Sequence, residues 1–136
     1  MILRGKISMT GLLFVLSGPS GVGKNTVLNK ILSLRPDLTY SISATTRPPR
    51  GQEVDGVNYY FLTKEQFEAE IENEGFLEWA EIYDHYYGTP KQAVFKWLNS
   101  GRHVILDVDI QGAVQIRKNY PQSILIFLYP PSIQEL

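Results

Sequence analysis

The chain has 136 residues, a length that suits one compact domain with its own hydrophobic core. Its 13 basic and 14 acidic side chains give a net charge of −1, which argues against polymeric nucleic acid as a partner and favours a small molecule. The chain has no cysteine, which excludes disulfides, thiol catalysis and cysteine-ligated zinc, and no apolar run approaches the roughly 18 residues of a membrane span.

The first residues carry no convincing targeting signal. Arg4 and Lys6 precede the apolar run from Leu12 to Leu16, as basic residues do in a secretory signal, but this run is too short and enters a glycine-rich turn. Met9 is an alternative start, which would make residues 1–8 an extension. We therefore expect a cytoplasmic protein without a membrane partner, and the sequence carries no signal for its oligomeric state.

The run from Leu12 to Leu16 predicts a strand, followed by a glycine-rich turn and a helix over residues 25–32. The turn's glycines allow its N–H groups to surround a phosphate, the helix directs the positive end of its dipole to the same point, and Lys24 adds a charge. The pattern predicts a site for ATP or GTP. Its residues are Gly18, Pro19, Ser20, Gly21, Val22, Gly23, Lys24, Asn25 and Thr26.

One position departs from this phosphate-loop pattern. Asn25 follows the lysine, where a serine or threonine hydroxyl usually contacts magnesium. Either Thr26 takes that role one residue later, or the metal is held through water.

Residues 43–89 differ in composition from the flanking segments, because they are rich in polar and aromatic side chains. A short strand is expected over 38–43, just before them, and a capping box that starts at Thr63 predicts a helix with Phe67 on its buried face. Thr89 is expected to cap a further helix with Pro90 in its first turn, ending before Gly101. We interpret 43–89 as an insertion that carries a binding site.

The chain then returns to a core of alternating strands and helices. Residues 104–109 predict a buried parallel strand with acidic residues at its C-terminal end, where open α/β sheets bind ligands. A helix over 110–118 and a strand over 123–128 follow, so the expected fold is a parallel sheet flanked by helices, with core residues 1–42 and 90–136. Ser132 and Glu135 then form a capping-box pattern, so the chain is expected to stop one turn into a helix and to be shortened at its C-terminus.

Four motifs in this order resemble guanylate kinase. They are Gly18 to Lys24, Ser43 to Glu53, Gly56 to Phe61, and Ile105 to Gly112. The resemblance covers nearly the whole chain from Gly11 onward and implies a P-loop core with a small mixed α/β insertion over 43–89 that binds GMP. It also implies transfer of the terminal phosphate of ATP to GMP, with Mg²⁺ as the cofactor.

The resemblance implies a role for each matching residue of the GMP site. Arg47 and Arg50 would bind the GMP phosphate together, which suits two guanidinium groups held three residues apart beside prolines. Glu78 would recognise guanine, because a carboxylate accepts from the ring N–H and the exocyclic amine together. The remaining GMP-binding residues implied are Ser43, Glu53, Tyr59, Tyr87, Thr89 and Asp109.

Lys24, Arg47 and Asp107 are the expected catalytic residues, and Asp107 could hold magnesium through water. The family carries further arginines in a lid beyond the last residue of this chain, so we expect an intact acceptor site and doubtful turnover. Two other functions stay open: a noncatalytic guanylate-kinase-like protein-binding module, and a kinase for another nucleoside monophosphate. A gene fragment without a stable function is a further possibility.

Overall fold

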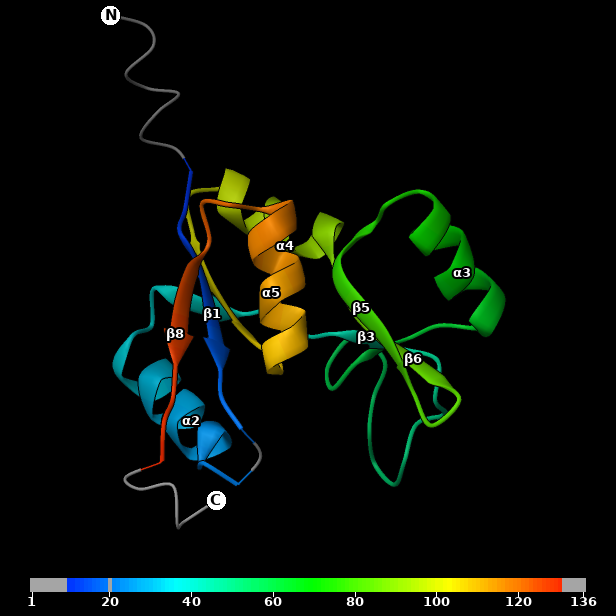
Figure 1. Cartoon of the computed structure of the whole chain (residues 1–136), viewed down its shortest axis with the longest axis horizontal. Coiled ribbons are helices and arrows are strands. Elements are labelled where there is room, and N and C mark those ends of the chain that lie inside the picture. The colour runs from blue at the N-terminus through cyan, green and yellow to red at the C-terminus, as the bar shows by residue number, and fades with distance from the viewer. Residues whose placement is uncertain (1–9, 20, 131–136) are drawn as a thin grey trace, which may run out of the picture.

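A parallel four-stranded sheet forms the core of the computed structural model, which describes residues 10–19 and 21–130 (Figure 1). All three strand pairings are parallel, and Phe14 of the central strand lies between Ile105 and Ile124. The C-terminal ends of the strands therefore meet at one edge, as predicted. In spatial order the strands are β2 (Leu38–Tyr40), β7 (His103–Asp107), β1 (Leu13–Ser17) and β8 (Ile124–Phe127).

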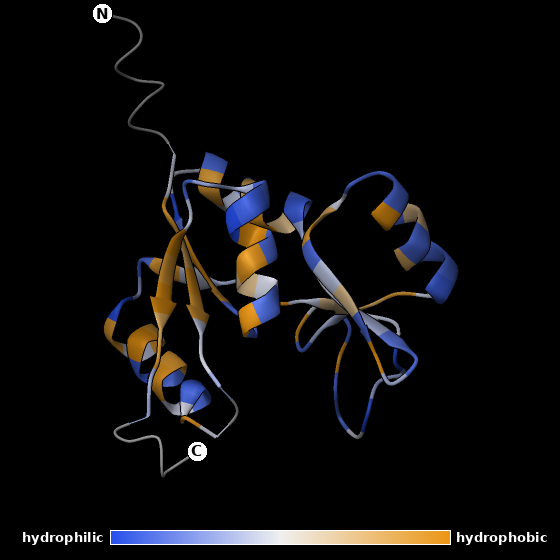
Figure 2. Ribbon diagram, viewed as in Figure 1, coloured by the Kyte–Doolittle hydropathy of each residue, from blue (hydrophilic) through white to orange (hydrophobic). Residues whose placement is uncertain are grey.

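Helices cover both faces of this sheet, because successive side chains of its central strands are apolar and point to opposite faces (Figure 2). Leu13 and Val15 pack on one face, while Leu16 packs with Leu28 on the other. Burial of each large apolar side chain contributes about 1.5–3 kcal/mol. The helices are α2 (Lys24–Leu34) on the Leu16 face, and α4 (Lys91–Asn99) and α5 (Ile110–Asn119) on the Leu13 face.

The segment between β2 and α4 builds a second, mixed sheet with its own small core. Thr63 starts the helix of this region with the predicted capping box. Phe67 of that helix is fully buried and stacks on Phe76 and Tyr86, with ring centroids 4.2 and 4.9 Å away. The elements are β4 (Tyr60–Phe61), β3 (Ala44–Thr45), β6 (His85–Pro90) and β5 (Phe76–Ile82), in spatial order, with α3 (Lys64–Glu72) beside them.

Helix α5 lies between the two sheets, in contact with β1 on one side and β5 on the other (Figure 1). It begins after Asp109, whose side chain accepts a hydrogen bond from the Gly112 N–H at 2.7 Å. Asp109 is therefore fixed at the C-terminal edge of the parallel sheet. Within the described residues, no helix combines the length and apolar character that a membrane crossing needs.

Three boundary predictions were wrong. Thr89 belongs to β6 and Pro90 is the N-cap of α4, because the Thr89 hydroxyl is engaged by Glu78 and not by the helix. The strand expected over 38–43 ends at Tyr40, and β7 ends at Asp107, two residues early, because Asp109 caps α5. The capping-box pattern at Ser132 lies outside the described residues.

Candidate nucleotide-binding site

The glycine-rich turn lines a pocket of about 400 Å³ at the N-terminus of α2, here called the phosphate-loop pocket. Gly21 and Gly23 have φ angles of 78° and 88°, a region that side-chain-bearing residues rarely adopt. Among the described residues no side chain caps α2, whereas α3 and α5 both have a capping side chain, so the N–H groups of the first turn of α2 are available to an anion. The pocket is lined by Gly18, Pro19, Gly21, Gly23, Lys24, Asn25, Thr26 and Asp109.

Lys24 links this pocket to the edge of the sheet. Its ammonium lies 2.9 Å from Asp107 Oδ1 and donates a hydrogen bond to the Val108 carbonyl at 3.1 Å. Apart from this ion pair, the buried Asp107 Oδ1 has no hydrogen-bond partner within the described residues. The cation and the carboxylate therefore lie together where the phosphate loop meets β7.

A second pocket, of about 210 Å³, lies between the mixed sheet and the C-terminal end of β7 and is here called the carboxylate pocket. Six of its ten lining residues were predicted for the site, although their positions in the chain run from 43 to 109. Asp109 lines both pockets, so the two are adjacent. The predicted lining residues are Ser43, Tyr59, Glu78, Tyr87, Asp107 and Asp109, and the others are Ala80, Ile82, Gly88 and Val108.

Glu78 presents a buried carboxylate to the carboxylate pocket. Thr89 lies opposite it on the neighbouring strand and donates its hydroxyl hydrogen to Glu78 Oε2 at 2.8 Å. Burial raises the pKa of Glu78, the charge of Asp109 adds to this, and the Thr89 hydrogen bond opposes it. Thr89 thus reaches the site through Glu78 and does not itself line the pocket.

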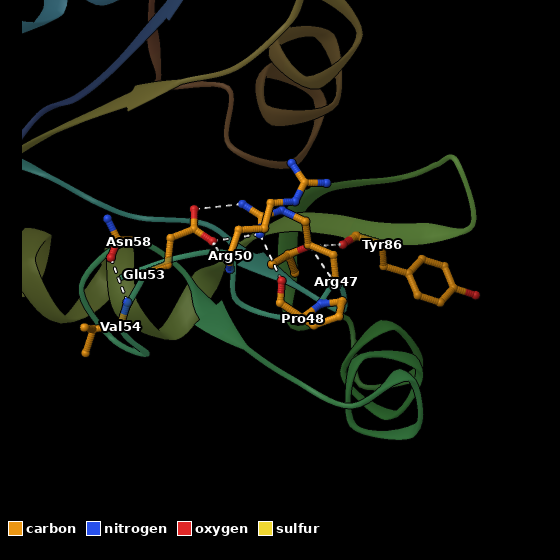
Figure 3. Close-up of polar contacts among 8 residues, drawn as sticks. Arg47, Pro48, Arg50, Glu53, Val54, Asn58 and Tyr86 are labelled. Carbon is orange, nitrogen blue, oxygen red and sulfur yellow. Dashed lines mark hydrogen bonds and ion pairs between the residues drawn. The ribbon is translucent and has the colours of Figure 1, made fainter.

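Arg47 is held by Glu53 in a bidentate ion pair, with nitrogen–oxygen distances of 2.8 and 2.9 Å (Figure 3). The Arg47 residue is only 6% exposed, and its guanidinium lies 4.9 Å from the centre of the Tyr59 ring, which connects it to the carboxylate pocket. Glu53 also accepts a hydrogen bond from the Arg50 backbone N–H. The two hydrogen bonds to Glu53 and one to Pro48 leave two of the five guanidinium N–H groups of Arg47 for a ligand.

The Arg47 ion pair predicts how stability depends on pH. Arg47 lowers the pKa of Glu53 from 4.5 to about 2, with help from the Arg50 N–H. A carboxyl group whose pKa is lower in the folded state stabilises the fold above its unfolded pKa, and this contribution is lost as the pH falls. We expect the stability difference between the unmodified chain and Glu53→Gln to be constant above pH 4.5 and to shrink from pH 4.5 toward 2.

Urea unfolding at a series of pH values measures this difference, with the exposed Glu72→Gln as the control acid. A difference that does not change with pH below 4.5 would show that the pair between Arg47 and Glu53 does not form in solution.

Not every predicted residue joins the two pockets. Arg47, Arg50 and Glu53 line neither pocket, and Arg50 is also exposed; Val22 lies outside the lining of the phosphate-loop pocket. Ser20 lies outside the described residues. The convergence of both arginines on one phosphate therefore stays a prediction.

Three residues of α5 that support the strand carrying Glu78 were not predicted as part of the site. The Gln115 side chain pairs with both the N–H and the C=O of Trp79, each at 3.1 Å, and Asn119 donates to the Leu77 carbonyl at 2.8 Å. Gly112 lies against the Glu78 carboxylate itself. Only Gly112 left a sequence signal, since a glycine inside a helical pattern often has a packing reason.

The described residues contain no group of three acidic or histidine side chains that could hold a metal ion. Magnesium at a nucleotide needs only one or two carboxylates, because phosphate oxygens and water supply the other ligands. Asp107 is the acid that fits this role, since its Oδ1 is buried beside the phosphate loop.

Comparison with known proteins identifies the family. Residues 10–136 match the family model described as guanylate kinase. The chain is 52% identical to a guanylate kinase of Caldanaerobacter subterraneus subsp. tengcongensis over 96% of its length, and 54% identical to one of Carboxydothermus hydrogenoformans over 93%. A crystal structure of guanylate kinase from Anaplasma phagocytophilum superimposes with a TM-score of 0.72 at 33% identity, covering 93% of this chain and 64% of that one.

The chain spans 63% and 62% of the lengths of these two curated relatives. The family match nevertheless extends over all four sequence motifs and both pockets. The chain therefore belongs to the guanylate kinase family.

Proposed function

We propose that the chain binds ATP and GMP in adjacent pockets and transfers the terminal phosphate of ATP to GMP, giving ADP and GDP. The observation that carries this proposal is the adjacency of the two pockets, which share Asp109. One pocket offers N–H groups and a lysine to phosphates, and the other offers a buried carboxylate to a base. A nucleotide in each pocket would bring a donor and an acceptor phosphate together.

Guanine is the base that suits the carboxylate pocket. Its ring N1–H and 2-amino group are two adjacent donors, and a carboxylate can accept from both. Adenine presents an acceptor at N1, so it would leave Glu78 without a donor in a buried site, at a cost of about 1–3 kcal/mol or more. Ser43 would supply a hydroxyl partner to the base, and the Thr89 hydroxyl would act on the base through Glu78.

Arg47, Arg50, Tyr59 and Tyr87 would bind the GMP phosphate. Glu53 supports this role because it fixes the Arg47 guanidinium and leaves two N–H groups unused. A guanidinium that is already oriented loses less entropy when it binds a phosphate than a mobile one. Glu53 would therefore act on the phosphate through Arg47.

Phosphoryl transfer forms a bond between a phosphate oxygen of GMP and the γ-phosphorus of ATP, and breaks the bond from that phosphorus to the β–γ bridging oxygen. The N–H groups of the phosphate loop would hold the ATP phosphates, and Lys24 would neutralise charge on the outer ones. Mg²⁺, when bound, would supply further positive charge to neutralise the phosphates, and Asp107 would hold it through water, with Thr26 or a further water as another ligand. Asp109 would orient the acceptor between the pockets.

We further propose that residues 43–89 are a GMP-binding subdomain on a core formed by 1–42 and 90–136. The separate hydrogen-bonded sheet β4-β3-β6-β5, with its own cluster around Phe67, supports this division. A cytoplasmic site of action in purine nucleotide metabolism is the corresponding physiological proposal.

Calorimetric titration of the folded chain with GMP, and with AMP as the competing base, tests the function. We expect GMP to bind at least about 100-fold more tightly than AMP, since a site built on hydrogen bonds to a base rejects an analogue that lacks them. Glu78→Gln should remove most of this preference, because the amide offers only one acceptor. The exposed Glu81→Gln on the same strand should leave it unchanged.

Equal affinity for GMP and AMP would favour another nucleoside-monophosphate kinase. No binding of either nucleotide by folded protein would contradict the proposal. Formation of GDP from ATP and GMP, followed separately, measures the transfer step.

A further inference from the structure

Gly112 is the point at which α5 contacts the Glu78 carboxylate. It is buried and is the third residue of the helix, where its N–H is bound by the Asp109 side chain. A Cβ atom at this position would lie 2.8 Å from Glu78 Oε1, closer than ordinary contact allows. A side chain at residue 112 would therefore require the end of the Glu78 side chain to leave its present position.

The backbone on both sides of Glu78 is attached to the same helix. Gln115 pairs with the Trp79 N–H and C=O, and Asn119 donates to the Leu77 carbonyl. Leu77 directly precedes Glu78 in β5 and Trp79 directly follows it, and β5 lies alongside α5 in Figure 1. The strand consequently cannot move away from the helix without loss of three hydrogen bonds.

The Glu78 carboxylate is held on its other side as well. Its Oε2 accepts the Thr89 hydroxyl hydrogen at 2.8 Å, while its Oε1 lies against Gly112. A side chain at 112 would push Oε1 and rotate the carboxylate away from Thr89, because the backbone is fixed. The two oxygens would then no longer be aligned with two donors on one base edge.

We propose that Gly112 is a specificity-determining positioning residue: the missing side chain at this helix position sets where the Glu78 carboxylate meets the 2-amino group and ring N–H of guanine. The inference rests on the proposed function, since it concerns recognition of GMP at that same site. Gly112 itself touches no ligand and acts through Glu78.

The test is Gly112→Ala, measured by calorimetry with GMP and with inosine 5′-monophosphate, which lacks the 2-amino group. We expect GMP affinity to fall by about tenfold or more, as for the loss of one hydrogen bond to a charged group, and the preference for GMP over inosine monophosphate to shrink. The thermal midpoint should change little, because the helix propensity gained with alanine offsets the loss of the hydrogen bond between Thr89 and Glu78. A merely structural role would lower stability and weaken both ligands equally.

Two further variants keep the test decisive. Val114→Ala on the exposed side of α5 also raises helix propensity and should leave both affinities unchanged. In a Glu78→Ala background, Gly112→Ala should have no further effect on GMP affinity, because the carboxylate through which it acts is gone.

The outcomes separate the two proposals. If the unmodified chain binds GMP no more tightly than AMP, or if Glu78→Gln leaves the preference for GMP over AMP intact, the proposed guanine site is contradicted. The proposed role of Gly112 is then contradicted as well. If Glu78→Gln removes the preference for GMP over AMP, but Gly112→Ala leaves the preference for GMP over inosine monophosphate intact, only the role of Gly112 is overturned. An equal loss from Gly112→Ala with and without Glu78 would overturn it too.

Discussion

Arg47→Met is expected to lower GMP affinity by about 100-fold or more while ATP affinity stays within about twofold. Hydrogen bonds to charged groups contribute about 1.5–3 kcal/mol each, and Arg47 has two N–H groups left for the phosphate. Methionine keeps an apolar stem but removes the guanidinium, which is the group that lies over the Tyr59 ring. At 1.4 kcal/mol per factor of ten, loss of both bonds gives the stated change.

Arg35→Met is the matched control for this experiment. Arg35 also forms a two-point ion pair, with Asp37, at 2.9 and 2.7 Å, but the pair is exposed and outside both pockets. We expect this variant to bind both nucleotides normally. Guanosine, which lacks the phosphate of GMP, provides a second control. It should bind Arg47→Met and the unmodified chain equally, because Arg47 is proposed to contact only the phosphate.

Comparable losses of GMP and guanosine in Arg47→Met would mean that Arg47 supports the base pocket and not the phosphate. A normal GMP affinity would contradict the assignment of Arg47 altogether. In that case the ion pair between Arg47 and Glu53 would affect the stability of the fold and not the binding of GMP.

The phosphate loop could be predicted from the sequence because its parts are contiguous. Strand β1, the turn at Gly21 and Gly23, and helix α2 follow one another directly, so local rules for strands, glycines and helix starts are sufficient. The parallel direction of β1, β7 and β8 could be predicted as well, since apolar strands alternate with helices along the chain, but their spatial order was not predicted.

The support behind Glu78 could not be predicted, because it joins residues far apart in the chain. Gln115 is 36 positions from Trp79, and Asn119 is 42 from Leu77. Nothing local marks an amide on α5 as the partner of a particular strand. The error at Thr89 has the same origin: a threonine before a proline is a good helix cap locally, but the nearby Glu78 carboxylate engaged its hydroxyl.

Lys24→Met is expected to lower ATP affinity by about 100-fold or more and to leave GMP affinity unchanged. Lys24 carries the cationic side chain that lines the phosphate-loop pocket, and the ATP phosphates would otherwise meet only N–H groups there. Calorimetry with ATP and with GMP measures both affinities on the same sample. The exposed Lys30→Met on the same helix is the matched control and should change neither.

The ion pair between Lys24 and Asp107 complicates the single variant, because methionine leaves a carboxylate that is only 15% exposed without its cation. We expect Lys24→Met to lower the free energy of unfolding by about 1–3 kcal/mol, the cost of an unpaired buried polar group. The double variant Lys24→Met with Asp107→Asn should recover much of this stability but none of the ATP affinity. If ATP affinity returned with stability, Lys24 would serve the fold through Asp107 and not the nucleotide. Recovery of stability alone would separate the two roles of one lysine, which neutralises Asp107 in the empty pocket and phosphate in the occupied one.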